Sequence, residues 1–160
     1  MSNGNKLSCV LILLFALLST LPLFDPIKLY LFCIPSAAGI TAPLSGGTFS
    51  LEPGMAVIQL EGLKILVPPS CSGMTFCLIL AFLFPVYGKW KYCFLSYPIA
   101  LAANGLRILA AAEWPQFLKE YLPHHEEFLH QGAGIVIFLS VLLIASFFLR
   151  FFTKRPKTEK

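Results

Sequence analysis

The chain has 160 residues, of which 57% are hydrophobic and only 12% are charged. A soluble domain carries about 25% charged residues, so the composition excludes an ordinary soluble protein and indicates several membrane spans. We therefore predict an all-α polytopic membrane protein with a single integral membrane domain over residues 1–160. The net charge of +4 is informative only once each charge is assigned to a side of the membrane.

The first half of the chain predicts one membrane span and one shorter helix. An uninterrupted apolar run predicts a transmembrane helix over residues 7–24. Its end lacks a small-x-small cleavage site, so we interpret it as an uncleaved anchor. Residues 25–28 (Asp-Pro-Ile-Lys) are interpreted as a turn. The apolar residues 29–44 are only 16 in number and contain two prolines and a glycine, which favours an interfacial or re-entrant helix.

Residues 46–68 predict a small β-meander on the extracytoplasmic side of the membrane. Three segments of strand-like composition lie at 48–51, 56–60 and 63–67. They are separated by Pro53-Gly54 and Glu61-Gly62, and both pairs are turn signals.

Three more transmembrane helices are predicted in the second half, which brings the total to about four. They cover residues 71–87, 92–112 and 131–152. A tight basic loop over residues 88–91 joins the first two, a polar connection over residues 113–129 joins the last two, and residues 153–160 form a basic cytoplasmic tail.

The distribution of charges predicts which side each loop occupies. The N-terminus, the basic loop and the tail together carry Lys6, Lys89, Lys91, Arg150, Lys154, Arg155, Lys157 and Lys160. The opposite side carries only Lys28, Lys64 and Lys119 among the cations, with seven of the eight carboxylates. By the positive-inside rule the first set is cytoplasmic. This orientation requires four spans; if residues 29–44 also cross, there are five and the N-terminus lies outside.

This topology brings three reactive side chains to the outer membrane face. Cys71 begins one span, Arg107 lies about 7 Å inside the outer end of the next at about 1.5 Å per residue, and His130 directly precedes the last. An arginine inside a span is costly and is a candidate functional residue by default. At the first turn of a helix, the unpaired N–H groups and the positive partial charge stabilise a cysteine thiolate.

Four further residues are predicted to support this site or bind the substrate. Asn104 lies one helical turn before Arg107, on the same face, and is placed to orient the guanidinium or a substrate. Ser72 and Gly73 follow Cys71 directly. Gly134 lies on a helix stripe between His130 and Phe138, where it allows a neighbouring helix to approach closely.

Each of the three reactive residues also has a simpler interpretation. Cys71 can be a small apolar residue at a helix start, Arg107 an anchor that snorkels to the interface, and His130 an interface histidine. A metal site from His124, His125 and His130 matches no standard zinc spacing, and the chain has no Cys-x-x-Cys pair. We therefore predict no metal and no cofactor.

The motifs together resemble the exosortase/archaeosortase family over about residues 30–150. They are Ser70-Cys71-Ser72-Gly73, Asn104-Gly105-Leu106-Arg107-Ile108, and His130 followed by Gly134 and Phe138. The short chain and the segment from Ile34-Pro35 to Gly54 resemble the small exosortase K subgroup.

The resemblance implies a cysteine peptidase or transpeptidase in the bacterial cytoplasmic (inner) membrane, with its active site on the extracytoplasmic face. It implies cleavage of a C-terminal sorting signal, of the PEP-CTERM kind, on exported proteins through a thioester at Cys71. Arg107 and His130 are then the other catalytic residues. The partners implied are the sorting signal and the lipid bilayer, with no nucleic acid, and the acceptor of the thioester is either water or an amine.

Two other functional classes stay open. One is a membrane thiol oxidoreductase, in which Cys33 is the partner of Cys71. The other is a non-enzymatic membrane assembly protein, in which none of the three reactive residues is needed for function.

Overall fold

A computed structural model describes residues 10, 14–15, 17–19, 21–118 and 126–153, without the side chains of 114–118, 126–131, 133, 152 and 153. The α-helices are α2 (Asp25–Lys28), α3 (Ile34–Ser36), α4 (Ala42–Ser45), α5 (Met74–Val86), α6 (Ser96–Leu118) and α7 (Glu126–Thr153). The strands are β1 (Thr48–Glu52), β2 (Met55–Leu60) and β3 (Leu63–Val67). Short 3-10 segments cover Pro22–Phe24, Pro69–Cys71 and Trp90–Leu95, and π-helical segments cover Leu29–Cys33 and Ala37–Thr41.

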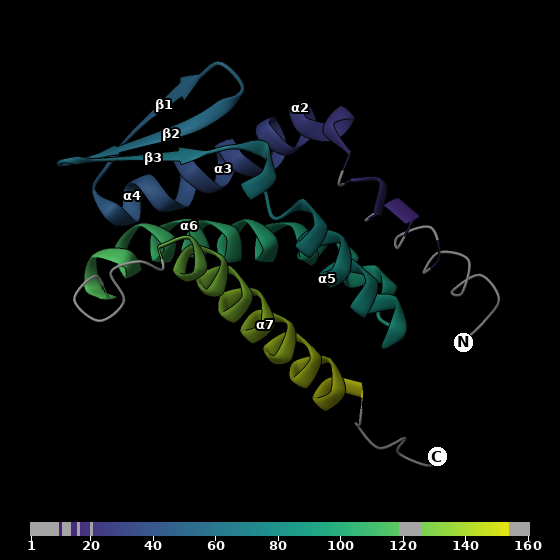
Figure 1. The fold of residues 1–160 in the computed structure, drawn as a ribbon. Coiled ribbons are helices and arrows are strands. Elements are labelled where there is room, and N and C mark those ends of the chain that lie inside the picture. Colours follow the sequence, from purple (N-terminus) through teal and green to yellow (C-terminus); the bar gives the residue numbers. More distant parts are fainter. Residues whose placement is uncertain (1–9, 11–13, 16, 20, 119–125, 154–160) are drawn as a thin grey trace, which may run out of the picture.

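The described residues include four helical stretches that are long and apolar enough to cross a membrane. They are Pro22–Ser45, Pro69–Val86, Trp90–Glu113 and Gly134–Phe151. Together with one small sheet, they give the mostly helical architecture predicted for a multi-pass membrane protein (Figure 1). In the predicted span 7–24, residues 7–9, 11–13, 16 and 20 lie outside the described residues, and so does the basic tail beyond residue 153.

Helical backbone runs without a break from Pro22 to Ser45, so the turn predicted at residues 25–28 is wrong. Pro26 occupies the first turn of α2, where a proline costs little because its missing N–H would be unpaired there anyway. The stretch has 24 residues, enough to span a bilayer. The interfacial placement of residues 29–44 stays a prediction.

This helical stretch lies beside α6 and runs in the same direction. Pro35 has no N–H to donate to the carbonyl of Leu31, and that carbonyl instead accepts a hydrogen bond of 2.7 Å from Tyr97 Oη. Ser36 Oγ donates to the carbonyl of Leu101 at 3.3 Å, and Thr41 Oγ1 donates to the carbonyl of Gly105 at 3.0 Å. Three hydrogen bonds in order along both helices fix their register.

The three strands form an antiparallel meander in the order β1-β2-β3, as predicted. Gly54 and Gly62 occupy the two turns with φ of +79° and +78°, a conformation that favours glycine. The inner face of the sheet packs on the helix of residues 22–45 and on Ile108 of α6. This cluster contains Leu29, Cys33, Ala37, Ala42, Ala56, Ile58, Val67 and Ile108. The extracytoplasmic placement of the sheet stays a prediction.

Helix α6 is the central element, because the helix of residues 22–45, α5 and α7 all pack against it. α5 and α7 extend away from the sheet (Figure 1), and their contact with α6 buries a second apolar cluster around Leu80, Phe84 and Ala103. The helices differ in length from the predicted spans: α5 starts three residues later, α6 continues to Leu118, and α7 already begins at Glu126. Part of the predicted polar connection is therefore helical.

Accessibility labelling tests the predicted sides of the membrane. Ser50→Cys and Glu61→Cys, introduced singly in a cysteine-free background, should react with a membrane-impermeant maleimide on intact cells, because both positions are exposed on the meander. Lys91→Cys, in the basic loop, should react only after permeabilisation. If position 61 reacts only after permeabilisation, the turn that carries Cys71 faces the cytoplasm and the proposed orientation is wrong.

Candidate active site

Cys71 lies on the 3-10 turn Pro69–Cys71, not within the first turn of α5 as predicted. Gly73 separates the turn from the helix with a left-handed backbone, φ +71°. Ser72 Oγ accepts a hydrogen bond of 3.2 Å from the N–H of Met74, so the serine caps α5. The Cys71 N–H donates to the carbonyl of Pro68 at 2.9 Å. Cys71 is therefore held by the turn itself, in a half-buried position.

The guanidinium of Arg107 reaches across from α6 and contacts Cys71 twice. Nη2 donates to Cys71 Sγ at 3.4 Å, and Nη1 donates to the Cys71 carbonyl at 3.3 Å. In the described part of the chain the ion pairs are Asp25–Lys28 and Glu52–Lys64, so Arg107 faces no carboxylate. The guanidinium therefore places a positive charge directly beside the sulfur, and this charge comes from α6 and not from the start of α5.

Asn104 is completely buried and links Arg107 to the segment after Cys71. Its Oδ1 accepts a hydrogen bond of 3.2 Å from Arg107 Nη1, which orients the guanidinium. A Cβ added at Gly73 would lie 3.2 Å from the Asn104 side chain, so Gly73 lets the turn approach α6 closely. Among the described residues Asn104 Nδ2 has no hydrogen-bond partner, which is unusual for a buried amide.

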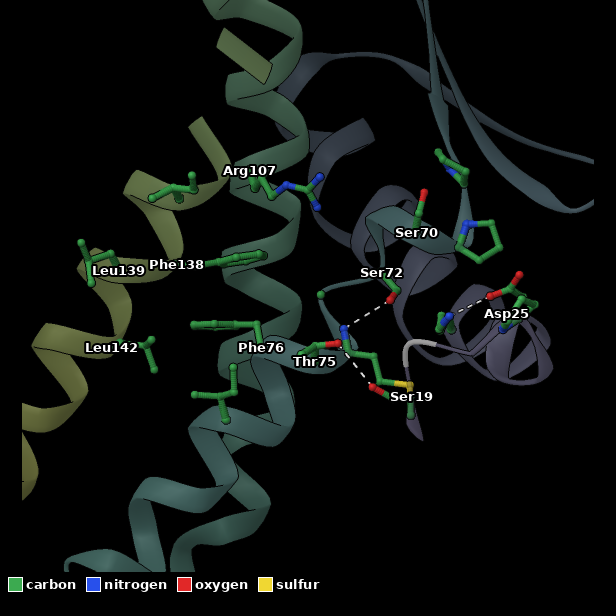
Figure 2. A pocket seen from close by; sticks show the side chains of 18 residues that line it. Ser19, Asp25, Ser70, Ser72, Thr75, Phe76, Arg107, Phe138, Leu139 and Leu142 are labelled. Atoms are coloured by element: carbon green, nitrogen blue, oxygen red, sulfur yellow. Dashed lines mark hydrogen bonds and ion pairs between the residues drawn. The ribbon is translucent and has the colours of Figure 1, made fainter. Parts of the chain in front are cut away.

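Helix α7 contributes space and an aromatic surface to the same site. A Cβ added at Gly134 would lie 2.9 Å from Arg107 Nε, so the arginine passes directly over this glycine. The guanidinium carbon lies 5.7 Å from the ring centre of Phe138, within the range of cation–π attraction. Phe138 stacks on Phe76 of α5 at 4.3 Å, and Figure 2 shows both rings near Arg107. His130 belongs to the first turns of α7, but its side chain lies outside the described residues.

A cavity of about 930 Å³ opens beside this cluster. One end is polar, with Arg107 and hydroxyls from the turn and the start of α5, and the other end is apolar and lies between α5 and α7 (Figure 2). The polar lining consists of Ser19, Asp25, Lys28, Ser70, Ser72, Thr75 and Arg107. The apolar lining includes Phe76, Ile79, Ile135, Phe138, Leu139 and Leu142. Such a cavity suits a chain that is polar in one part and apolar in the next.

Asp25 and Lys28 line this cavity although the sequence analysis treated them as a turn. Lys28 Nζ lies 2.7 Å from Asp25 Oδ1 and also donates to the carbonyl of Leu21 at 3.3 Å. The lysine is buried, and a lysine is rarely buried without a carboxylate partner. The sequence does contain a signal for this ion pair, because the Asp-x-x-Lys spacing puts both side chains on one face of a helix.

Within the described residues, no three His, Cys, Asp or Glu side chains gather closely enough to hold a metal ion. His124 and His125, which were considered as metal ligands, lie outside the described residues. The arrangement that is present, a thiol beside an arginine that a buried amide orients, is suited to nucleophilic attack on a carbonyl group.

Comparison with known proteins identifies one family. The family model described as transmembrane exosortase (Exosortase_EpsH) matches residues 7–147, which is most of the chain. No curated protein and no solved structure shows a significant match.

The contact between Gly134 and Arg107 gives a test of the arginine's position. In Gly134→Ala the new methyl group must displace Arg107 Nε, and a displacement near 1 Å at a reacting group is expected to cost roughly 10- to 100-fold in activity. Gly132→Ala is the matched control, since a Cβ there meets nothing within 4 Å. Both changes replace a helical glycine by a better helix former, so both proteins should accumulate normally. Equal activity of the two variants would show that the position of Arg107 is irrelevant.

Proposed function

Because this chain belongs to the transmembrane exosortase family, we propose that it is a membrane-embedded cysteine peptidase or transpeptidase. Its substrate is a C-terminal sorting signal of the PEP-CTERM kind on exported proteins, and it forms a thioester at Cys71. The contact of 3.4 Å between Arg107 Nη2 and Cys71 Sγ carries this proposal. It pairs a nucleophile with a permanent positive charge, and Arg107 together with Ser70 and Ser72, the neighbours of Cys71, lines a cavity that is large enough for a peptide segment.

The reaction begins when His130 takes the proton of the Cys71 thiol, which leaves the sulfur as a nucleophile beside Arg107. The sulfur attacks the scissile carbonyl carbon, and the carbonyl oxygen acquires negative charge in the tetrahedral intermediate. The backbone N–H groups of Cys71, Ser72 and Met74 already donate hydrogen bonds, to Pro68 O, Pro69 O and Ser72 Oγ respectively. We assign the oxyanion to the Arg107 guanidinium, whose Nη2 lies 3.4 Å from the sulfur.

Collapse of the intermediate needs a proton on the leaving amine. His130 is our candidate for this acid, because its helix α7 carries Gly134 and Phe138 against Arg107. The same imidazole then removes a proton from the acceptor, either water or an amine, which attacks the thioester and releases the product. An imidazole is suited to both steps because its unperturbed pKa is near neutrality.

The shape of the cavity supports a substrate with a membrane tail. Its polar end adjoins Cys71 through Ser70, Ser72 and Arg107, and its apolar end lies between α5 and α7. A sorting signal consists of a polar segment followed by a hydrophobic helix, so its two parts match the polar and the apolar end of the cavity. In the predicted topology the polar end faces the extracytoplasmic side.

Arg107→Lys tests the role of the guanidinium. Lysine keeps the positive charge but loses the planar fork that reaches the sulfur, the Cys71 carbonyl and Asn104 at once. We expect cleavage of a tail-anchored substrate to fall roughly 100-fold, the usual effect of losing an oxyanion donor, while immunoblots of membranes show normal amounts of enzyme. Full activity in this variant would support a simple membrane anchor.

A thiol oxidoreductase is the second candidate, and one observation favours it. Cys33 Sγ donates to the carbonyl of Pro68 at 3.4 Å, and the N–H of Cys71 donates to the same oxygen. The two free cysteines therefore share one hydrogen-bond acceptor, although Cys33 belongs to the helix of residues 22–45 and is fully buried. A redox enzyme needs both thiols, whereas a transpeptidase needs only Cys71.

Substitution of the cysteines separates the two functions. Cys71→Ser should abolish cleavage and the thioester, because an alcohol is far less acidic than a thiol. Cys33→Ser, and a variant in which Cys9, Cys33, Cys77 and Cys93 are all replaced by small residues, should retain cleavage. Mass spectrometry of the trapped acyl-enzyme locates the modified residue. Loss of activity in the folded Cys33→Ser and Cys71→Ser proteins alike would identify a redox enzyme instead, because such an enzyme needs both thiols.

A further inference from the structure

Strand β3 leads directly to the candidate nucleophile. It ends at Val67, and only the three residues 68–70 separate it from Cys71. The Cys71 N–H is bonded to the carbonyl of Pro68, so the sulfur is fixed relative to the end of the strand. In the order β1-β2-β3, one edge of β3 has no strand beside it in the described part of the chain.

The register shows which backbone groups point to this free edge. Leu60 and Leu63 close the β2–β3 hairpin around a two-residue turn, so these two exchange hydrogen bonds. Alternation along the strand then turns the backbone groups of Leu63, Ile65 and Val67 toward β2. Those of Lys64 and Leu66 point outward, which gives two N–H donors and two C=O acceptors along the free edge.

The side chains of these two residues leave the edge open. Leu66 is 51% exposed. Lys64, whose charge would ordinarily protect an edge strand, pairs with Glu52 of β1 at 2.6 Å. Since β2 lies between β1 and β3, the lysine side chain extends back across the sheet and away from the free edge.

The free edge is also continuous with the cavity. Residues 68–70, which follow β3, line its polar end together with Arg107. We propose that the outer edge of β3 binds an extended peptide as a fourth strand and delivers its next residues to Cys71. This inference rests on the proposed function and names the segment of substrate that precedes the scissile bond.

The direction of the bound strand follows from the cavity. β3 runs toward Cys71, and a substrate whose membrane tail occupies the apolar end of the cavity runs the same way, so the added strand is parallel to β3. Strand addition reads the backbone and not the side chains, so the segment is recognised by being extended and accessible.

A peptide with a thiol-reactive end tests this edge without knowledge of the natural substrate. The probe is acetyl-(Thr-Val)₃ with a C-terminal vinyl sulfone, and methyl vinyl sulfone is the bare reagent. The full-length protein in lipid nanodiscs is treated with each, and mass spectrometry gives the rate of Cys71 alkylation. The rate of Cys71 alkylation by the peptide probe, divided by the rate with methyl vinyl sulfone, gives a ratio that measures peptide binding. N-methylation of alternate residues of the probe should lower this ratio about 25-fold, since two backbone hydrogen bonds are lost and each contributes about fivefold.

Leu66→Pro removes one outward N–H of β3, and a proline is tolerated at an edge where that N–H faces solvent. We expect the ratio to fall about fivefold, the effect of one hydrogen bond. Leu51→Pro is the matched control: Glu52 and Met55 close the other hairpin, so Leu51 points its N–H to the free edge of β1. Strand β1 is connected in the chain to α4 and not to Cys71. The ratio measured for Leu51→Pro should therefore equal that of the unchanged protein.

The outcomes test strand addition at β3 separately from the proposed function. If Leu66→Pro and Leu51→Pro have equal ratios, or if N-methylation has no effect on the unchanged protein, strand addition at β3 is wrong while Cys71 remains the nucleophile. If Cys71→Ser retains cleavage of a tail-anchored substrate, the proposed function itself is wrong. The N-methylated probe needs no variant, so it decides the question even if Leu66→Pro fails to fold.

Discussion

The contact between Arg107 and the Cys71 turn is the constraint on which the rest of the site depends. A guanidinium carried by an apolar helix is costly in a membrane protein unless its donors are satisfied. Here the sulfur, the Cys71 carbonyl and Asn104 Oδ1 accept its hydrogen bonds, and the ring of Phe138 lies beside it. Two glycines make this possible, because a Cβ at Gly73 would crowd Asn104 and a Cβ at Gly134 would meet Arg107 itself. The contacts that stabilise the arginine also hold its guanidinium against the Cys71 sulfur.

Because Cys71 lies before α5, its position depends on the sheet as well as on the helices. The turn begins where β3 ends, and Cys71 packs against the apolar cluster that joins the sheet to the helix of residues 22–45. α5 starts only after Gly73, with Ser72 as its cap. Cys71 therefore lies at the junction of the meander and the helical bundle, where the charge of Arg107 from α6 meets the end of β3, the strand proposed to bind a peptide.

Sequence reasoning recovered the features that depend on local signals. Two turn dipeptides located the meander, and the charge distribution together with helical spacing placed Cys71, Asn104 and Arg107 in one neighbourhood. The break at Gly73 was missed, because a left-handed residue between a 3-10 turn and a helix leaves no pattern in the sequence. Asp25 and Lys28 were misread because Pro26 signals a turn as readily as a first helical turn. The cavity is formed by segments distant in the chain, and only tertiary packing reveals it.

The prolines of the helix over residues 22–45 have an effect on how the protein responds to its bilayer. Apolar surface gives little net attraction between helices in lipid, so polar contacts contribute much of the specificity of their pairing. Tyr97 Oη donates to the carbonyl of Leu31, which has no helical N–H donor at Pro35, and two further hydrogen bonds from hydroxyl groups follow along the same interface. If this helix slid along α6 by one residue, all three hydrogen bonds would break. A thinner or thicker bilayer tilts helices to match its hydrophobic depth, and these two helices should then tilt as one body, carrying Arg107 and the cluster beneath Cys71 together.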